Sequence, residues 1–161
     1  MGVTQHSFRV AASVPDEMVS LDCGDEWAAW SGVDCGTADG RETVVLVSIT
    51  VAPFGLAPGA TAGAVLKKTL RARHPAGSGV IEEFTADDGN PAVLVRCAVT
   101  QQLNGRPVTT GQAQALVVFP SAGALGVVSA LCPDPADLER AAALVAAIAV
   151  RMTVTAATAA A

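Results

Sequence analysis

Alternation of apolar with polar or small residues recurs along the chain, and a period of two is typical of β-strands. It predicts a short strand within Ser7–Val14, a brief extended piece at Val19 and Leu21, and another strand at Gly79–Thr85. The clearest run in the first half, Glu42–Pro53, is largely apolar on both of its faces. We therefore expect a central strand that is covered on both sides.

Beyond residue 90 the pattern predicts three strands in succession and then one long helix, with most of the expected core. Asn104-Gly105 indicates a hairpin turn, because both residues tolerate positive φ. Pro107 cannot donate a hydrogen bond to a neighbouring strand, so we expect a loop longer than two residues and a return strand at Thr109–Phe119. The next strand is predicted at Ala124–Cys132.

Two segments have helical patterns. Ala60–His74 is predicted as a helix with Thr61 as its N-cap. Asp134 can cap a final helix whose first position is Pro135, where a missing N–H costs nothing. The apolar stripe of that helix is expected to face a sheet: Leu138, Ala141, Val145, Ile148 and Met152. The tail at residues 153–161 is expected to be frayed.

Residues 22–41 break these patterns, because glycines and aspartates replace any sustained period. They predict a loop or a single helical turn. Trp27 and Trp30 are three positions apart, so a helical turn would place both on one face. Either they pack onto the sheet as part of a lid, or they form an apolar partner surface together with Phe54.

Composition limits the class of protein. A length of 161 residues fits one domain spanning the whole chain. Hydrophobic residues make up 51% and charged residues 16%, which supplies a sizeable core and excludes a disordered chain. The formal net charge of -5 argues against nucleic acid as a partner, because no general basic face is available.

The sequence shows no sign of export or membrane insertion. No basic segment followed by a continuous apolar run stands at the N-terminus, so no leader is expected. The most apolar later run, Ala141–Val150, is shorter than the roughly 20 residues that a membrane-spanning helix needs. We expect a cytoplasmic protein.

The four cysteines form no C-x-x-C pair: Cys23, Cys35, Cys97 and Cys132. In the cytoplasm they are expected to be buried reduced thiols, whereas export would allow two disulfides. A zinc site would need more ligands, and the candidates are His6 and His74. Neither a metal nor another cofactor is predicted.

Candidate catalytic groups are few. Glu82 and Glu83 are adjacent in a predicted strand, so their carboxylates point to opposite faces and cannot act on one substrate. Asp87-Asp88-Gly89 has the composition of a turn. The sequence has no nucleophile elbow, phosphate-binding loop, zinc-protease motif or dinucleotide fingerprint. It is therefore predicted not to be an enzyme.

Four cations crowd the C-terminal half of the predicted Ala60–His74 helix: Lys67, Lys68, Arg71 and Arg73. Cations in this position suit the helix macrodipole and are typical of a solvated helix face. The alternative interpretation is a patch for an anion or an acidic partner.

The order of the predicted elements resembles the PsbP/Mog-type α-β-α sandwich family, whose small actinobacterial members share this layout. The resemblance rests on G-N-P-A at residues 89–92 entering a long strand, on the strand Gln112–Phe119, and on Cys132-Pro133 before an acidic-capped helix. Members commonly follow the first strand with P-x-G-W, where this chain has P-D-E-M at residues 15–18. The fold expected is α+β, with a predominantly antiparallel sheet flanked by helices.

The family resemblance implies mostly non-enzymatic roles: photosystem assembly subunits, a small-GTPase-binding protein, lipoproteins, and chaperones that hold secretion effectors. The first hypothesis is accordingly a protein-binding or adaptor module, such as a secretion-related chaperone or assembly factor, whose partner is another protein or a second copy. One alternative is a small-molecule-binding protein or weak enzyme with a pocket between sheet and helix. Another is a structural subunit of an oligomer.

Overall fold

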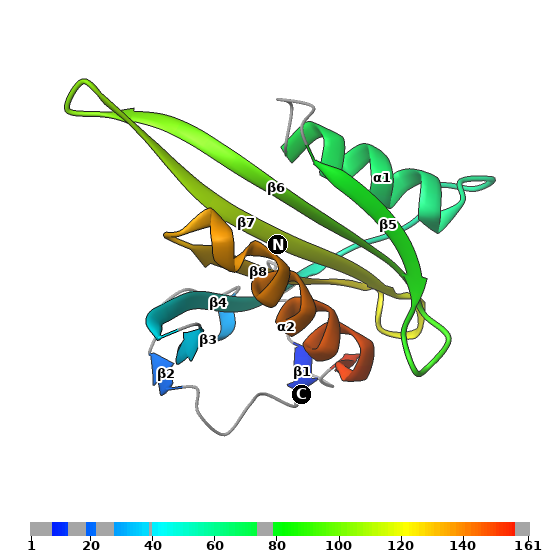
Figure 1. Ribbon diagram of the computed structural model, residues 1–161. Coiled ribbons are helices and arrows are strands. Elements are labelled where there is room, and N and C mark those ends of the chain that lie inside the picture. The colour runs from blue at the N-terminus through cyan, green and yellow to red at the C-terminus, as the bar shows by residue number, and fades with distance from the viewer. Residues whose placement is uncertain (1–7, 13–18, 22–27, 39, 74–78, 157–161) are drawn as a thin grey trace, which may run out of the picture.

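The computed structural model describes residues 8–12, 19–21, 28–38, 40–73 and 79–156 (Figure 1). The strands are β1 Phe8–Ala11, β2 Val19–Leu21, β3 Ala28–Ala38, β4 Arg41–Pro53, β5 Val80–Thr85, β6 Pro91–Leu103, β7 Arg106–Phe119, β8 Ala124–Cys132 and β9 Thr153–Ala156. The helices are α1 Ala62–Arg73 and α2 Leu138–Arg151, and 3-10 turns lie at Pro120–Ala122 and Pro135–Asp137.

The strands form one large and one small sheet. Seven of them follow the order β2-β3-β4-β8-β7-β6-β5, and each neighbouring pair is antiparallel. β1 and β9 form a separate antiparallel pair, so the two described ends of the chain meet. The antiparallel α+β class expected from the sequence is confirmed.

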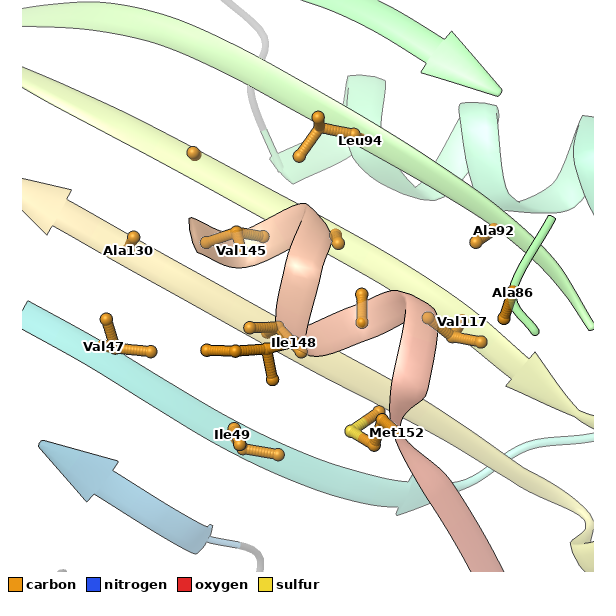
Figure 2. Packing of buried hydrophobic residues seen from close by; sticks show 14 of the residues in the cluster. Val47, Ile49, Ala86, Ala92, Leu94, Val117, Ala130, Val145, Ile148 and Met152 are labelled. Atoms are coloured by element: carbon orange, nitrogen blue, oxygen red, sulfur yellow. The ribbon is translucent and has the colours of Figure 1, made fainter. Parts of the chain in front are cut away.

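Helix α2 covers one face of the large sheet. Four residues of its predicted apolar stripe are buried, namely Ala141, Val145, Ile148 and Met152, and Leu138 is partly buried against them. Figure 2 shows Val145, Ile148 and Met152 lying over the strands, whose alternate residues such as Val47 and Val117 belong to the same cluster. Apolar residues recur at every third or fourth position of the helix and at every second position of the strands. The two apolar surfaces face each other and are buried together.

A polar cap starts α2, much as the sequence predicted. The Asp134 carboxylate accepts a hydrogen bond from the Ala136 N–H at 2.9 Å, and Pro135 follows at the first position of the 3-10 turn. The cap therefore serves the short turn that leads into the helix, and α2 itself begins at Leu138.

Helix α1 lies against the opposite face, which gives helix, sheet and helix as three layers (Figure 1). Leu66 and Leu70 are fully buried among strand residues that include Val95, Leu116 and Val127. The Thr61 carbonyl accepts the first helical hydrogen bond, from the Val65 N–H at 3.1 Å. The N-terminal boundary agrees with the predicted cap position.

The loop predicted across residues 22–41 is wrong for residues 28–38. They form β3, paired with β4 from Ala28↔Thr50 to Ala38↔Arg41. Local composition disfavours a strand there, but the glycines and aspartate have tertiary partners: at Gly36 an added Cβ would lie 2.5 Å from Arg140 Nη2. Trp30 therefore lies in a strand and not in a helical turn, while Trp27 lies outside the described residues.

Two further boundaries differ from expectation. Thr153–Ala156 pairs with β1, so the predicted frayed tail is a strand there; residues 157–161 lie outside the described range. The turn at Asn104 and Gly105 is confirmed with φ of 52° and 76°, but its loop has only these two residues. Pro107 is tolerated in β7 because no second strand flanks β7 beyond Gly111.

Strand β4 is covered on one face only along its first half. Val45 and Val47 are buried under α2, whereas Val44 is 37% and Leu46 is 41% exposed. The expectation of cover on both sides is wrong at these positions. Helix α1 packs over the far end of the sheet and does not extend across them.

Candidate functional site

The face that carries α1 is open at its other end. There β3, β4, β8 and β7 surround a hollow of about 380 Å³. The side chains that shape it come from alternate positions on the α1 side of the sheet: Leu46, Ser48, Gln112, Gln114, Ser129 and Leu131. This hollow is the candidate site.

A row of neutral polar side chains crosses the hollow at one level. The strand registers align Ser31 with Ser48, Ser48 with Ser129, and Ser129 with Gln114. Gln114 Nε2 donates a hydrogen bond to Ser129 Oγ at 2.8 Å, while the buried Gln114 Oε1 receives none from the described residues. The row offers hydroxyl and amide groups, which both donate and accept.

An apolar row lies beside the polar one. Val33 is aligned with Leu46, Leu46 with Leu131, and Leu131 with Gln112. Leu46 and the next residue on its face, Val44, are among the most exposed large apolar side chains of the described chain. The hollow therefore joins exposed hydrocarbon to neutral hydrogen-bonding groups, a combination typical of non-covalent binding sites.

No ionisable side chain lines the hollow within the described part of the chain. A serine hydroxyl needs an adjacent base to become a nucleophile, and general acid–base catalysis needs a titratable group in reach. Of the serines in the row, Ser129 accepts its printed hydrogen bond from an amide, which is not a base. The described side chains of the hollow can bind and orient a partner through hydroxyl, amide and apolar contacts.

Charged residues gather on the opposite face, around the start of α2. Arg140 donates to Asp34 Oδ2 at 3.0 Å and to Thr43 Oγ1 at 2.6 Å. Arg41 forms ion pairs with Asp134 and Asp137, both at 2.8 Å. Asp34 and Asp137 are each only 4% exposed. These contacts fasten the β3–β4 hairpin to α2, and each buried carboxylate is used by the scaffold.

Three cysteines lie in the described residues, and no two of them form a disulfide with each other. Cys97 and Cys132 are buried as expected, whereas Cys35 is exposed. Burial raises the pKa of the Cys97 thiol. Burial, and then the nearby Asp137 charge, raise the pKa of Cys132. A raised pKa disfavours the reactive thiolate, so neither buried cysteine is poised as a nucleophile.

The structure describes only part of the aromatic partner surface proposed from the sequence. Phe54 is partly buried and packs against the α1-side cluster. Trp30 belongs to β3, and Trp27 lies outside the described residues. A surface at the two tryptophans stays a prediction.

The proposed basic patch is spread along α1. Lys67 forms an ion pair with Glu83 at 3.2 Å, while Lys68 and Arg71 are exposed. Arg73 is the last residue of the helix. Glu82 pairs with Arg96 on the other face of β5, so the two adjacent glutamates do point apart, as predicted.

Sequence reasoning missed the hollow, although its signals were present. Gln112 and Gln114 alternate with buried alanines in β7, and Ser48 interrupts an otherwise apolar run in β4. Polar residues at every second position of a core strand indicate a face without full cover. Their convergence depends on strand order, which local patterns do not specify.

Among the described side chains, no group of three or more histidines, cysteines and carboxylates is placed to hold a metal ion. Neither α1 nor α2, the helices found in the described ranges, is long and apolar enough to cross a membrane.

The chain matches no known family model and no curated protein. A solved structure to which it is similar is that of LpqN from Mycobacterium tuberculosis, described as involved in cell envelope biogenesis. The match covers 93% of this chain and 85% of the LpqN chain, with 17% sequence identity and a TM-score of 0.58. At this identity the likeness shows a shared fold alone.

Proposed function

We propose that the protein is a non-enzymatic binding module that holds another polypeptide on the open end of its sheet. The observation that carries this proposal is a hollow whose described lining combines exposed leucine with neutral hydrogen-bonding groups and includes no ionisable side chain. Apolar surface left uncovered beside polar groups is typical of interaction sites. The absence of acid, base and activated nucleophile from the lining supports binding without catalysis.

The extent of the exposed apolar surface favours a polypeptide. Beyond the hollow, Val44, Leu103 and Val108 leave 37%, 55% and 37% of their surface exposed. A compact ligand seated in the hollow would leave these side chains in water. A polypeptide can cover them together with the hollow.

The arrangement of the layers supports the same proposal. A helix on each face of an antiparallel sheet agrees with the PsbP/Mog-type α-β-α sandwich, a family of mostly non-enzymatic roles. LpqN, described as involved in cell envelope biogenesis, shares the fold. An adaptor, chaperone or assembly factor is the role that we infer.

The proposed compartment is the cytoplasm. The exposed free thiol of Cys35 supports it, because exposed free thiols persist where the surroundings are reducing. Fractionation of native cells tests this location. Recovery of the protein with the cell envelope would contradict it and would suggest a setting like that described for LpqN.

Photo-crosslinking in native cells tests the binding surface. A photoreactive residue at position 46 should capture a discrete polypeptide, and the same residue at position 143, on the exposed side of α2, should not. Both positions are solvent-accessible, so the comparison separates specific contact from random collision. Equal labelling at the two positions, or none at position 46, would refute the proposal.

A small-molecule-binding protein is the second candidate, favoured by the volume of the hollow. About 380 Å³ is within the range of small-ligand sites. A ligand that binds the native state must raise the melting temperature. If a neutral metabolite does so in the native protein but not in a Ser129→Trp variant, whose side chain would fill the hollow, this candidate replaces the first.

A further inference from the structure

Two hairpins project beside the hollow. β8 pairs with β7 only as far as Gly111 and with β4 only as far as Leu46. Past these residues the β3–β4 hairpin and the β6–β7 hairpin each continue as a two-stranded ribbon. Figure 1 shows the β6–β7 ribbon reaching well beyond the body of the protein. A ribbon of two strands is marginally stable in water without further packing.

The exposed apolar side chains of both ribbons face the side of the hollow. Gln101 of β6 is paired with Val108 of β7, and Leu103 is paired with Arg106. Because alternate residues of a strand share a face, these four residues lie on the same face as Gln112 and Gln114. In β4, Val44 and Leu46 share the face of Ser48. Four of the six exposed large apolar residues in the described chain therefore lie on this one surface: Val44, Leu46, Leu103 and Val108.

In the strands that the structure describes, this surface carries one charge of each sign. The strands β3, β4, β6, β7 and β8 contain five charged residues: Asp34, Arg41, Glu42, Arg96 and Arg106. Three of them lie on the α2 side and form ion pairs there: Asp34 with Arg140, Arg41 with Asp134, and Arg96 with Glu139. The open side keeps Glu42 on the β3–β4 hairpin and Arg106 on the β6–β7 hairpin.

The strand order relates these two charges. β8 lies between β4 and β7, so a two-fold axis along β8 exchanges the positions of β4 and β7. Ser48 and Gln114 are both aligned with Ser129 of β8, so they lie level with each other. Because β4 and β7 are both antiparallel to β8, they run in the same direction. Glu42, six residues before Ser48, therefore lies level with Val108, six residues before Gln114. Arg106 is two residues further, or about 7 Å along the strand, a gap that an arginine side chain can bridge.

We propose that the occupant of the open face is a second copy of this chain, packed face to face about an axis along β8. Glu42 of each copy then meets Arg106 of the other, and both contacts form at once because a two-fold interface is self-complementary. Ser48 of one copy lies opposite Gln114 of the other, hydroxyl against amide. The exposed side chains Val44, Leu46, Leu103 and Val108 are covered.

Charge favours this face over the rest of the surface. Each copy has a net charge of -5, so two copies repel each other in general. The open face contributes no net charge in its strands, and its single acid and single base become complementary across the axis. This assignment rests on the proposed function, because it names the polypeptide that the binding surface takes.

Sedimentation equilibrium of the purified full-length protein, with charge-swap variants, tests the proposal. The native chain should form a dimer. Arg106→Glu and Glu42→Arg should each weaken dimerisation by about tenfold or more, since each replaces two attractive contacts with two repulsive ones. The double variant restores opposite charges and should recover most of the affinity. Lys68→Glu and Asp88→Arg are matched controls, because they make the same charge changes at exposed positions on α1 and in the β5–β6 turn.

Each outcome is decisive. All four charged residues that are changed are exposed, so equal melting temperatures establish that every variant is folded. A native chain that stays monomeric at its highest soluble concentration overturns the dimer. A dimer unaffected by either single swap, or not restored by the double variant, also overturns it because another face is then used. If the dimer fails while position 46 still captures a different polypeptide in cells, the proposed binding function stands and only its occupant changes. If both fail, both are wrong.

Discussion

At the scale of single residues, close packing against α2 requires small side chains in the strands. Gly126 is buried in β8, where an added Cβ would overlap the Met152 Cε atom and lie 2.8 Å from Phe119 Cε2. Gly111 similarly leaves room for the Cys132 sulfur and for Leu138. Alternate alanines in β7 act in the same way. The helix approaches closely because the sheet presents little bulk beneath it.

The Gly126→Ala variant should therefore unfold more easily. We expect a loss of about 1–3 kcal/mol in unfolding free energy, because the methyl group must displace Met152 or Phe119 in a packed core. Urea denaturation measures this loss. Gly55→Ala is the control, since an added Cβ there meets nothing within 4 Å. Equal stability of the two variants would contradict the packing argument.

The buried thiols predict a pH dependence. Because the pKa values of Cys97 and Cys132 are raised in the folded state, folding favours their protonated forms. That contribution is complete below the unfolded thiol pKa of about 8.5 and is lost as the pH rises through the higher folded values. The unfolding free energy should therefore fall as the pH rises above the unfolded thiol pKa. The Cys132→Ala variant should show a shallower fall; an unchanged slope would contradict the assignment.

At the scale of elements, the joint between the β3–β4 hairpin and α2 is ionic. Asp34 lies in an 11-residue strand whose composition predicts a loop, and its carboxylate is buried beneath Arg140. A buried carboxylate is stabilised only while its partner and hydrogen bonds are present. The contact therefore stabilises both the strand and its docking on the helix.

Arg140→Leu should destabilise the protein by about 2–4 kcal/mol, because it leaves the Asp34 carboxylate without its ion pair. Adding Asp34→Leu should recover part of the loss, since the uncompensated charge is removed. Thermal and urea unfolding measure both steps. Arg151→Leu, an exposed change in the last turn of the same helix, should cost much less. Comparable losses at positions 140 and 151 would show that the buried pair is unimportant.

At the scale of the whole molecule, the two faces of the sheet are covered unequally. α2 and the β1–β9 pair cover one face, whereas α1 covers only the far end of the other. The open end combines apolar side chains, neutral polar side chains, one acid and one base. The proposed dimer, which the charge-swap experiment tests, follows from this unequal cover. A second copy about an axis along β8 would complete the missing layer.

Much of the architecture could be predicted from the sequence. The Asn104-Gly105 turn, the capping aspartate and the stripe of α2 are local signals, and each lies where expected. The failures lie where local and tertiary preferences conflict. Residues 28–38 are rich in glycine and contain an aspartate, yet pairing with β4 and the Arg140 contact hold them as a strand.

The candidate site was less accessible to prediction. Ser48, Gln114 and Ser129 come from three strands that are far apart along the chain, and only the order β4-β8-β7 places them on one level. The aromatic and basic candidates were chosen by residue type. Phe54 packs against the core and Lys67 pairs with Glu83, and composition does not reveal such contacts.

The sequence by itself determined the class of this protein, an antiparallel α+β domain with a long amphipathic final helix. The apolar residues recur with a period of two in strands and of 3.6 in helices, and both periods can be recognised from residues close together in the chain. Only the tertiary structure decided that one face of the sheet stays open beyond α1, and that Glu42 and Arg106 flank it. Those facts depend on strand order and on where α1 ends over the sheet. Both arise from contacts between residues distant in the chain, which local patterns do not encode.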